Sequence, residues 1–513
     1  MPDRAPAAGV GRALALARRV PRRIVVLVVV ILVPVAILST ALHRHGQGWG
    51  DDFALYVRQA KSLIDGNVGQ VIADNHVNVD SAAKPGFSPY VYPWSFPVLL
   101  APFVRLWGLN LDKLKLGEVG CWCGFRACWF GVLRRRMSTW LALCTTAAAG
   151  FSLPYLQHTD SILSELPYMF ALAFTLWFVD RVRRSAPSWD QIDRRRLVLL
   201  GIAMMVVFNV RREGLAIVPA VMAMQLVDVW PRRRAQPRPD WRNLVTPHAV
   251  FLASVLLVQL MLPSALAPEY DGSGLGQTWR KLRGPFQDSF VQQLGFDHMA
   301  KGVLLVVALI VAAGVVVRVG HHAADDIGIL VVAGGSAVIA GMIPADSSRY
   351  TLAITPLLVY FGVQAAAAIP RTRRAGGGAL TLCLLTASAV DIPSAVAQAR
   401  DFDRSGAVVA GPMQQTSLEM FAAVKRYTHH DDLIAFYKGR ALSLYTDRRA
   451  VQSKDLSLIL ERADFFVMGV SGSTGIPILT APEAADAGLV EVWSNAAWTL
   501  WRVPDPFDAK LDP

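Results

Sequence analysis

Charged residues are scarce in this chain. Asp, Glu, Lys and Arg make up 18% of its 513 residues, whereas hydrophobic residues make up 53%. Water-soluble globular proteins carry about 25% charged residues. The shortage of charge excludes an ordinary soluble enzyme of this length, and it predicts a mainly α-helical protein that crosses a lipid bilayer many times.

Cysteine is also rare, and its positions exclude two kinds of site. None of the five cysteines has the spacing that is typical of a zinc site or of a disulfide framework. All of them lie within apolar runs: Cys121, Cys123, Cys128, Cys144 and Cys383. We therefore interpret them as small apolar packing residues.

The charges that are present are mostly positive, with a formal net charge of +12. Such a balance would suit a nucleic-acid partner, but the arginines occur in short clusters between apolar runs. Cytoplasmic loops of membrane proteins have this pattern, because positive residues are retained inside. We therefore predict no nucleic-acid partner.

The first apolar run places the N-terminus. Residues 1–23 are rich in Arg and Ala and are expected to form a cytoplasmic tail. Ile24–Leu42 follows, and as a helix it would be about 28 Å long at about 1.5 Å per residue, close to the ~30 Å of a hydrocarbon core. A cleaved signal peptide is the alternative, but Leu38–His43 is a weak cleavage site and many further apolar runs follow.

Ten more apolar runs predict a transmembrane domain over residues 24–392 with eleven spans. They are Leu114–Leu133, Thr139–Gln157, Leu163–Asp180, Leu197–Val210, Leu215–Trp230, His248–Ala267, Gly302–Val317, Ile327–Ile343, Thr351–Ile369 and Gly376–Ile392. With the N-terminus inside, the arginine clusters between the runs all fall on the cytoplasmic side. The odd number of spans places the C-terminal residues 393–513 outside.

The composition of the C-terminal region differs from that of the spans. Asp431–Tyr437 and Asp464–Gly469 are typical of strands, and Glu419–Tyr427 and Leu456–Arg462 are typical of helices. Leu489–Trp501 predicts a hairpin. We expect a small extracytoplasmic α/β domain here.

Residues 43–113 form the first external loop on this map. Its later part is rich in proline and aromatic residues, and Pro93, Pro97 and Pro102 make a straight span unfavourable. The aromatic side chains favour the headgroup layer of the bilayer.

The adjacent aspartates Asp51 and Asp52 are the most informative feature of this loop. Two neighbouring carboxylates raise each other's pKa unless a cation or a hydrogen bond offsets their repulsion. They precede a helical pattern that ends at Asp65-Gly66-Asn67, so they lie where a helix N-terminus favours negative charge. One aspartate acting only as an N-cap is the alternative interpretation.

Other polar residues lie at the outer ends of the predicted spans, where they are candidates for function. They are Lys84, His158, Asp160, Glu165, Arg211, Arg212, Glu213, Asp346 and Arg349. Structural alternatives exist for some of them. Arg212 could pair with Glu213, Glu165 could cap its helix with Ser164, and Arg349 could extend to the membrane interface.

The order of several short motifs resembles that of the GT-C glycosyltransferases, which are membrane enzymes that use polyprenyl-phosphate sugars. Within that superfamily the chain is most similar to the group with protein O-mannosyltransferases, aminoarabinose transferases and rhizobial lipopolysaccharide sugar transferases. The motifs are Gly50–Tyr56, Tyr92–Pro102 with Leu106–Gly108, Ser164–Pro167, Arg211–Gly214 and Ser348–Tyr350 ahead of Pro356. They span about residues 49–356.

The resemblance implies an inverting transferase in the bacterial inner (plasma) membrane with an extracytoplasmic active site. By position in the first motif, Asp51 matches the family's catalytic aspartate, and Asp52 stands where Glu is more usual. We expect Asp51 to act as base and Asp52 to assist it, with Arg349, Arg211 and Lys84 holding the donor phosphate.

Further residues are expected to support the site or to bind the acceptor: Tyr56, Asp160, Glu165, Arg212, Glu213 and Tyr350. A divalent metal between Asp51 and Asp52 is left open, because carboxylates suit hard cations. Nothing in the external residues distinguishes one sugar from another, and the acceptor could be a glycolipid, an envelope glycan or a protein.

A transporter or flippase and a membrane sensor or scaffold are the alternatives to a transferase. A transporter or flippase would also place polar residues among spans, but it would distribute them to the middle of the membrane rather than at one surface. A membrane sensor or scaffold would leave the paired aspartates unexplained.

Overall fold

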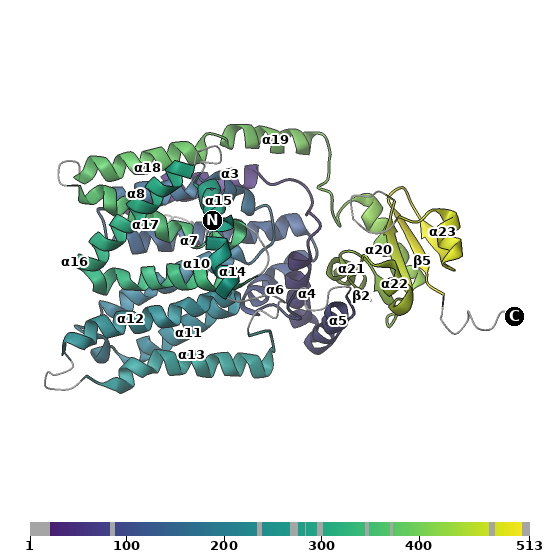
Figure 1. Cartoon of the computed structure of the whole chain (residues 1–513), viewed down its shortest axis with the longest axis horizontal. Helices are drawn as coiled ribbons and strands as arrows, with labels where there is room; N and C mark the ends of the chain where they lie inside the picture. Colours follow the sequence, from purple (N-terminus) through teal and green to yellow (C-terminus); the bar gives the residue numbers. More distant parts are fainter. Residues whose placement is uncertain are drawn as a thin grey trace, which may run out of the picture.

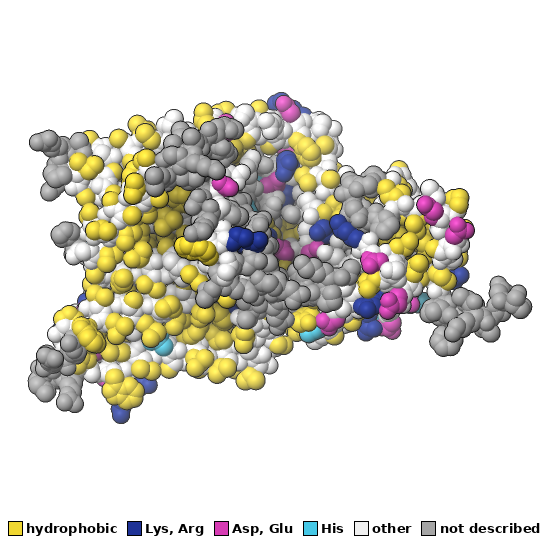
Figure 2. Space-filling model, in the orientation of Figure 1, with side chains coloured by type: hydrophobic (Ala, Val, Ile, Leu, Met, Phe, Trp, Pro, Cys, Tyr) yellow, Lys and Arg dark blue, Asp and Glu magenta, His cyan; other side chains and the backbone are white. Residues whose placement is uncertain are grey.

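Long apolar helices form the larger part of the protein, and a small α/β domain lies at one end of it (Figure 1). The computed structural model describes residues 21–82, 88–232, 239–266, 275–282, 284–294, 301–343, 348–369, 373–470 and 478–504. Figure 2 shows hydrophobic side chains over most of the visible bundle, whereas acidic and basic side chains gather toward the α/β domain. An apolar outer surface on a helical bundle is what a lipid environment requires.

The bundle begins with one helix that contains a π-helical stretch: α2 (Arg22–Val26), η1 (Leu27–Leu32) and α3 (Val33–Ala41). Its further long helices are α7 (Leu111–Leu133), α10 (Glu165–Arg183), α11 (Arg194–Val210), α12 (Ile217–Val229), α13 (Trp241–Met261), α16 (Lys301–Met342), α17 (Thr355–Ala368) and α18 (Arg373–Ala389). Each of them overlaps a predicted apolar run, although the bounds differ: α13, for example, begins before the predicted run His248–Ala267.

Five helices of the described residues are long and apolar enough to cross a membrane: Ile24–Ala41, Arg212–Arg232, Trp241–Met261, His322–Met342 and Ala375–Arg404. Shorter apolar helices accompany them. This finding supports a membrane protein, while the number of eleven spans stays a prediction.

Two predicted runs have a different form in the structure. The run Thr139–Gln157 is divided into α8 (Thr139–Gly150) and α9 (Leu153–His158), with Pro154 near the start of the second helix. The two runs after Gly302 lie in a single element, α16, which has non-helical backbone angles at His322. That residue belongs to the loop predicted between the two runs.

Short elements connect the long helices of the bundle. They are η2 (Trp189–Gln191), η3 (Arg212–Ala216), η4 (Trp230–Arg232), α14 (Leu275–Leu282), α15 (Pro285–Gln293) and η5 (Ser348–Thr351). After α18, helix α19 (Ile392–Arg404) packs on α3 and leads toward the α/β domain (Figure 1).

Three helices of the first loop lie between the bundle and the α/β domain (Figure 1): α4 (Asp51–Asp65), α5 (Val68–Asp80) and α6 (Ser95–Trp107). Helix α4 ends at Gly66, which has a φ of +75° and caps the helix as the sequence predicts. The proline-rich segment forms α6 with Pro102 inside it. At 13 residues, α6 is shorter than the roughly 20 residues of a typical span.

The α/β domain contains one five-stranded sheet with the strand order β2-β1-β3-β5-β4. Its strands are β1 (Leu433–Ala435), β2 (Arg449–Val451), β3 (Phe465–Gly469), β4 (Val490–Ser494) and β5 (Trp498–Arg502). The first three are parallel, and β5 runs antiparallel to both β3 and β4. The predicted strands, including the hairpin β4–β5, are confirmed, whereas β2 was not predicted.

Four helices complete this domain: α20 (Gln415–Tyr427), α21 (Gly439–Thr446), α22 (Leu456–Arg462) and α23 (Ala481–Asp486). Helix α22 has the predicted bounds. Helix α21 contacts α4 and α5, and β2 contacts α5, so the domain rests directly on the helices of the first loop.

Trp49 joins the hydrophobic cores of the two parts. It packs against buried residues of the bundle and also against those of the α/β domain. Its ring makes edge contacts with Phe421, Phe436, Tyr437 and Trp498, with ring centroids 5.6–6.3 Å apart. Since Trp49 lies two positions before Asp51, this contact fixes the start of α4 against the C-terminal domain.

Candidate active site

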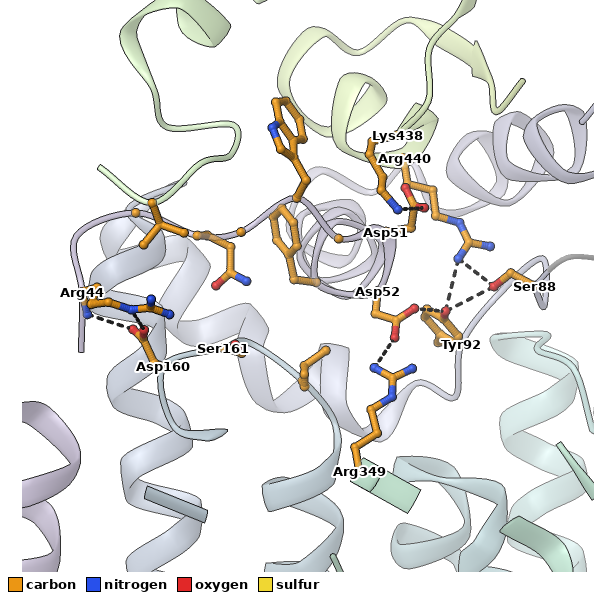
Figure 3. A pocket seen from close by; sticks show the side chains of 18 of the residues that line it. Arg44, Asp51, Asp52, Ser88, Tyr92, Asp160, Ser161, Arg349, Lys438 and Arg440 are labelled. Atoms are coloured by element: carbon orange, nitrogen blue, oxygen red, sulfur yellow. Dashed lines mark hydrogen bonds and ion pairs between the residues drawn. The ribbon is translucent and has the colours of Figure 1, made fainter. Parts of the chain in front are cut away.

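A cavity of about 520 Å³ lies where the bundle, the first loop and the α/β domain meet. Figure 3 shows side chains from all three parts pointing toward it. Its charged lining residues are Arg44, Asp51, Asp52, Asp160, Arg349, Lys438 and Arg440. The cavity therefore contains three carboxylates and four cations, drawn from distant parts of the chain.

The paired aspartates occupy the first two positions of α4. Gly50 is the N-cap residue, with extended backbone angles and no side chain that could cap the helix. The alternative that Asp51 or Asp52 is only an N-cap is therefore wrong. Both carboxylates lie inside the first turn, where the helix dipole favours their ionised forms.

Asp52 is held by two partners. Arg349 Nη1 lies 2.6 Å from its Oδ2, and the hydroxyl of Tyr92 donates to its Oδ1 at 2.5 Å (Figure 3). Burial alone would raise the pKa of Asp52, but the charge of Arg349 and these hydrogen bonds outweigh burial and lower it. Asp52 is therefore a stably ionised carboxylate and a weak base.

Asp51 has a different environment. Lys438 Nζ lies 3.3 Å from its Oδ2, and its buried Oδ1 has no hydrogen-bond partner among the described residues. Burial raises the pKa of Asp51, and the opposing charges of Lys438 and Arg440 only partly offset this effect. Of the two aspartates, Asp51 has the higher affinity for a proton and one oxygen without a partner in the described part of the chain.

Arg349 and Arg211 share Glu165 in one ionic cluster. Arg211 Nη1 lies 2.6 Å from Glu165 Oε1, and Arg349 Nε lies 3.5 Å from the same oxygen. Arg211 Nη2 also lies 2.8 Å from Glu213 Oε1. The predicted alternative that Arg349 extends to the membrane interface is thus wrong, because its guanidinium faces two carboxylates.

Two other structural alternatives from the sequence are also wrong. Arg212 does not pair with Glu213: it donates to Ala265 O at 2.7 Å and to Ser264 Oγ at 2.8 Å. Both residues lie in η3, and in a tight 3₁₀ turn adjacent side chains point in different directions. Glu165 does not share a cap with Ser164, whose hydroxyl instead accepts from Tyr56 and Arg211.

A second cavity of about 100 Å³ adjoins the first on the bundle side. Asp52, Tyr92, Arg349 and Tyr350 line both cavities. The smaller one is also lined by Tyr56, Arg211, Arg212 and Glu213. The ion pair between Asp52 and Arg349 therefore lies at the boundary between the two cavities.

Asp160 lines the larger cavity, and its contacts fix the backbone of the segment before α4. Its Oδ1 lies 2.8 Å from Nζ of Lys115, a fully buried side chain of α7. It also accepts from the backbone N–H of Arg44 at 3.1 Å. Lys115 in turn donates to the carbonyls of Arg44 and Gly46, so this pair anchors the segment that leads into α4.

The structure brings together most of the residues that the sequence singled out: Asp51, Asp52, Tyr56, Glu165, Arg211, Arg212, Glu213, Arg349 and Tyr350 line the two cavities or the ionic cluster beside them. His158 Nε2 lies 3.9 Å from Glu165 Oε2. Lys84 and Asp346 lie outside the described residues.

Sequence reasoning missed Lys438 and Arg440. They directly follow β1 and the two aromatic residues after it, at the carboxyl end of a parallel strand. Ligand sites in α/β proteins commonly occur at this edge of a sheet, so strand β1 contained a usable signal. Tyr92 was placed at the membrane interface and at the start of a family motif, but its hydrogen bond to Asp52 was not predicted.

A metal between Asp51 and Asp52 fits this arrangement poorly. Within the described ranges no three His, Cys, Asp or Glu side chains form a group that could hold a metal ion. Each aspartate instead faces a cationic side chain, Lys438 or Arg349. Each carboxylate therefore already has a cationic partner, which reduces its attraction for a divalent ion.

Two kinds of membrane enzyme have solved structures similar to this one. The chain matches ArnT from Cupriavidus metallidurans bound to undecaprenyl phosphate with a TM-score of 0.55 and 12% identity, over 94% of this chain and 98% of that one. It matches the oligosaccharyltransferase of Archaeoglobus fulgidus with a TM-score of 0.52 and 12% identity, over 86% and 69% of the two chains. The chain therefore shares the fold of these two proteins, and this is the fold that the sequence motifs predicted. No protein-family model matches the chain, and a search of curated proteins finds no significant sequence relative.

Proposed function

We propose that this protein is an inverting glycosyltransferase that moves a monosaccharide from a polyprenyl-phosphate donor to a hydroxyl of an extracytoplasmic acceptor. The observation that carries the proposal is Asp51, a buried carboxylate with a raised pKa in the wall of the larger cavity. Its neighbour Asp52 is paired with an arginine at the boundary to the smaller cavity. A base beside an anion-binding group is what this transfer needs.

The similar structures support a lipid-phosphate donor. The ArnT structure contains undecaprenyl phosphate, and one structure of the archaeal oligosaccharyltransferase, with a TM-score of 0.50, contains a dolichol phosphate and an inhibitory peptide. In this chain the smaller cavity lies on the bundle side, where a membrane-embedded lipid would approach. We assign it to the donor phosphate and the larger, polar cavity to the acceptor.

In the proposed reaction the acceptor oxygen attacks the anomeric carbon from the face opposite the phosphate. Asp51 accepts the hydroxyl proton as the new carbon–oxygen bond forms. The bond between the anomeric carbon and the phosphate oxygen breaks, and the lipid phosphate leaves with the electron pair. Attack from the opposite face inverts the anomeric configuration.

The cations of the ionic cluster stabilise the leaving phosphate in this scheme. Arg349 faces both cavities, and Arg211 lines the smaller one. Asp52 and Glu165 hold the Arg349 guanidinium in place before the donor arrives, so little reorganisation is needed as charge develops. Lys84 remains a further candidate for this role, and Tyr56 and Tyr350 support the walls of the donor cavity.

Asp51→Asn tests the base directly, because it removes the charge and keeps the shape. Purified protein would be incubated with labelled polyprenyl-phosphate sugars and an acceptor extract, and release of polyprenyl phosphate would be measured. We expect the rate to fall about 100- to 10,000-fold. The matched control is Asp65→Asn at the other end of α4, where the carboxylate is exposed and forms a surface ion pair with Lys61.

Two results would reject the proposal. Full transfer activity in Asp51→Asn would remove the base assignment. Movement of labelled lipid across a vesicle membrane by the wild type, without release of lipid phosphate, would identify a flippase instead.

A further inference from the structure

Residues 438–440 extend from the α/β domain to the catalytic carboxylates (Figure 3). They follow β1 and begin helix α21, which packs on α4 and α5. The backbone approach to α5 is close, because a Cβ at Gly439 would overlap Asn78 Nδ2. Asn78 donates in turn to the carbonyl of Ala450 at 2.9 Å. The segment is therefore held firmly against the first loop.

Arg440 connects this segment to Asp52. Arg440 is only 2% exposed. It donates to Asn75 Oδ1 at 3.0 Å and to Pro89 O at 2.7 Å. It also donates to the Tyr92 hydroxyl at 3.2 Å, and that hydroxyl donates to Asp52. Arg440 thus fixes the ring and hydroxyl that orient one catalytic carboxylate.

Lys438 acts on the other carboxylate directly. Its ammonium group lies 3.3 Å from Asp51 Oδ2, and the two side chains are 27% and 10% exposed. A cation at this distance favours the ionised form of a carboxylate. The buried Asp51 can act as a base only in that form.

We propose that Lys438 and Arg440 are positioning residues for the transfer reaction, so that the α/β domain is a working part of the active site. Lys438 keeps Asp51 ionised and fixed, and Arg440 orients Asp52 through Tyr92. This inference rests on the function proposed above.

The charges around Asp51 determine the sign of the expected pH effect. Lys438 and Arg440 of the α/β domain lower the pKa of Asp51, while burial and the neighbouring Asp52 raise it. Tyr437 also faces Asp51, and its own pKa is raised by burial, so it stays neutral. Removal of the Lys438 charge therefore raises the pKa of Asp51, and a larger fraction of the base is protonated at a given pH.

The first experiment measures kcat and KM against pH for the wild type, Lys438→Met and Lys438→Arg. An opposite charge close to an aspartate typically shifts its pKa by about 1–3 units. We therefore expect the acid limb of kcat in Lys438→Met to move upward by about one unit or more, with the KM for the donor unchanged. Lys438→Arg should restore the wild-type profile. Lys454→Met, at an exposed position of the same domain, is the control and should leave the profile unchanged.

A second measurement does not depend on transfer activity. A water-soluble carbodiimide modifies protonated carboxyl groups, and modification of the peptide that contains Asp51 can be followed by mass spectrometry across a pH range. The midpoint of modification should move upward in Lys438→Met by the same amount as the acid limb. Unfolding temperatures of all variants show whether each protein is folded.

The outcomes separate this inference from the proposed function. If the wild type transfers sugar and neither profile moves in Lys438→Met, the inference is wrong. A rise in KM alone would also overturn it, because Lys438 would then bind substrate. If the wild type transfers no sugar but the modification midpoint still moves, the proposed reaction fails while the control of Asp51 by Lys438 stands.

Discussion

The position of Arg349 bears most directly on how the proposed donor phosphate would be bound. Its guanidinium contacts Asp52 at 2.6 Å and approaches Glu165 at 3.5 Å, and its side chain remains 28% exposed. A planar guanidinium can bind a carboxylate with one edge and a phosphate with another, which an ammonium group cannot do. Under the proposed function, Arg349 can therefore bind the lipid phosphate while it keeps its ion pair with Asp52.

Arg349→Lys should accordingly impair donor use although it keeps the charge. A charge-assisted hydrogen bond contributes about 1.5–3 kcal/mol, so loss of one should lower donor turnover about tenfold or more. Initial rates against donor concentration, in detergent or nanodiscs, measure this effect. Unchanged curves for both Arg349→Lys and Arg349→Ala would mean that Arg211, Lys84 or another cation holds the phosphate.

Arg212→Lys is the comparison at the neighbouring cluster. Arg212 uses its guanidinium to bind Ala265 and Ser264 and to cover the ring of Phe208. Arg212→Lys should therefore lower the unfolding temperature, and it should lower donor turnover less than Arg349→Lys does. The opposite ranking of Arg349→Lys and Arg212→Lys in the kinetic assay would contradict the roles assigned to them.

Sequence patterns selected residues that the structure brings together, but they did not predict the contacts that those residues make. Asp51, Arg211 and Arg349 could be selected because polar groups at the outer ends of apolar runs are costly unless they serve a purpose. The partner of Arg212 could not, because the direction of adjacent side chains depends on the local turn. The structural role of Asp160 could not be predicted either. Its partner Lys115 is buried, but nothing in the sequence distinguishes Lys115 from an exposed lysine of a helix.

Among the helices, the close approach between α5 and the start of α21 can be tested by substituting Gly439. Gly439→Ala would displace Asn78 Nδ2 and break its hydrogen bond to Ala450. Such a loss costs about 1–3 kcal/mol when a buried group is left unpaired. We expect a lower unfolding temperature, followed by tryptophan fluorescence, together with lower transfer activity.

Two further variants control this prediction. In an Asn78→Ala background the obstructing atom is absent, so Gly439→Ala should add little further destabilisation. Gly69→Ala, on α5 but with open space around its Cβ, should be neutral. Additive effects of Asn78→Ala and Gly439→Ala would mean that this contact does not limit the docking of the domain.

Helix ends and strands were predictable where local chemistry determines them. Gly66 ends α4 because its φ of +75° favours glycine, and the apolar runs of β1 and β3 fit buried strands. The division between α8 and α9 was missed, because the apolar pattern continues through the break. Strand β2 is only three residues long and carries too little pattern to be recognised.

At the scale of the molecule, the proposed orientation in the membrane can be tested by labelling. In a Cys383→Ser background, Gly69→Cys on α5 and Asp486→Cys on α23 should react with an impermeant thiol reagent added outside intact cells. Arg195→Cys at the start of α11 should react only after the membrane is opened. All three positions are exposed in the structure. Labelling of Arg195→Cys and Asp486→Cys from the same side would refute the predicted map.

The interface between the α/β domain and the first loop could not be predicted from either segment alone. The sequence around Trp49 gives no sign of a distant partner, yet Trp49 packs among aromatic side chains of the C-terminal domain. Composition distinguishes the two parts of the chain. It carried no information on which surfaces touch, because that depends on shapes formed by residues far apart.

The ion pair between Asp51 and Lys438 joins positions 387 residues apart, and this separation has a consequence for biosynthesis. The carboxylate is translated 387 residues before its cation and enters a bundle that is still growing. A chain that stops before position 438 would retain every bundle helix described above and still lack the cation beside its base. Under the proposed mechanism, the nascent enzyme therefore stays inactive beside its lipid substrate until the α/β domain has folded against the first loop.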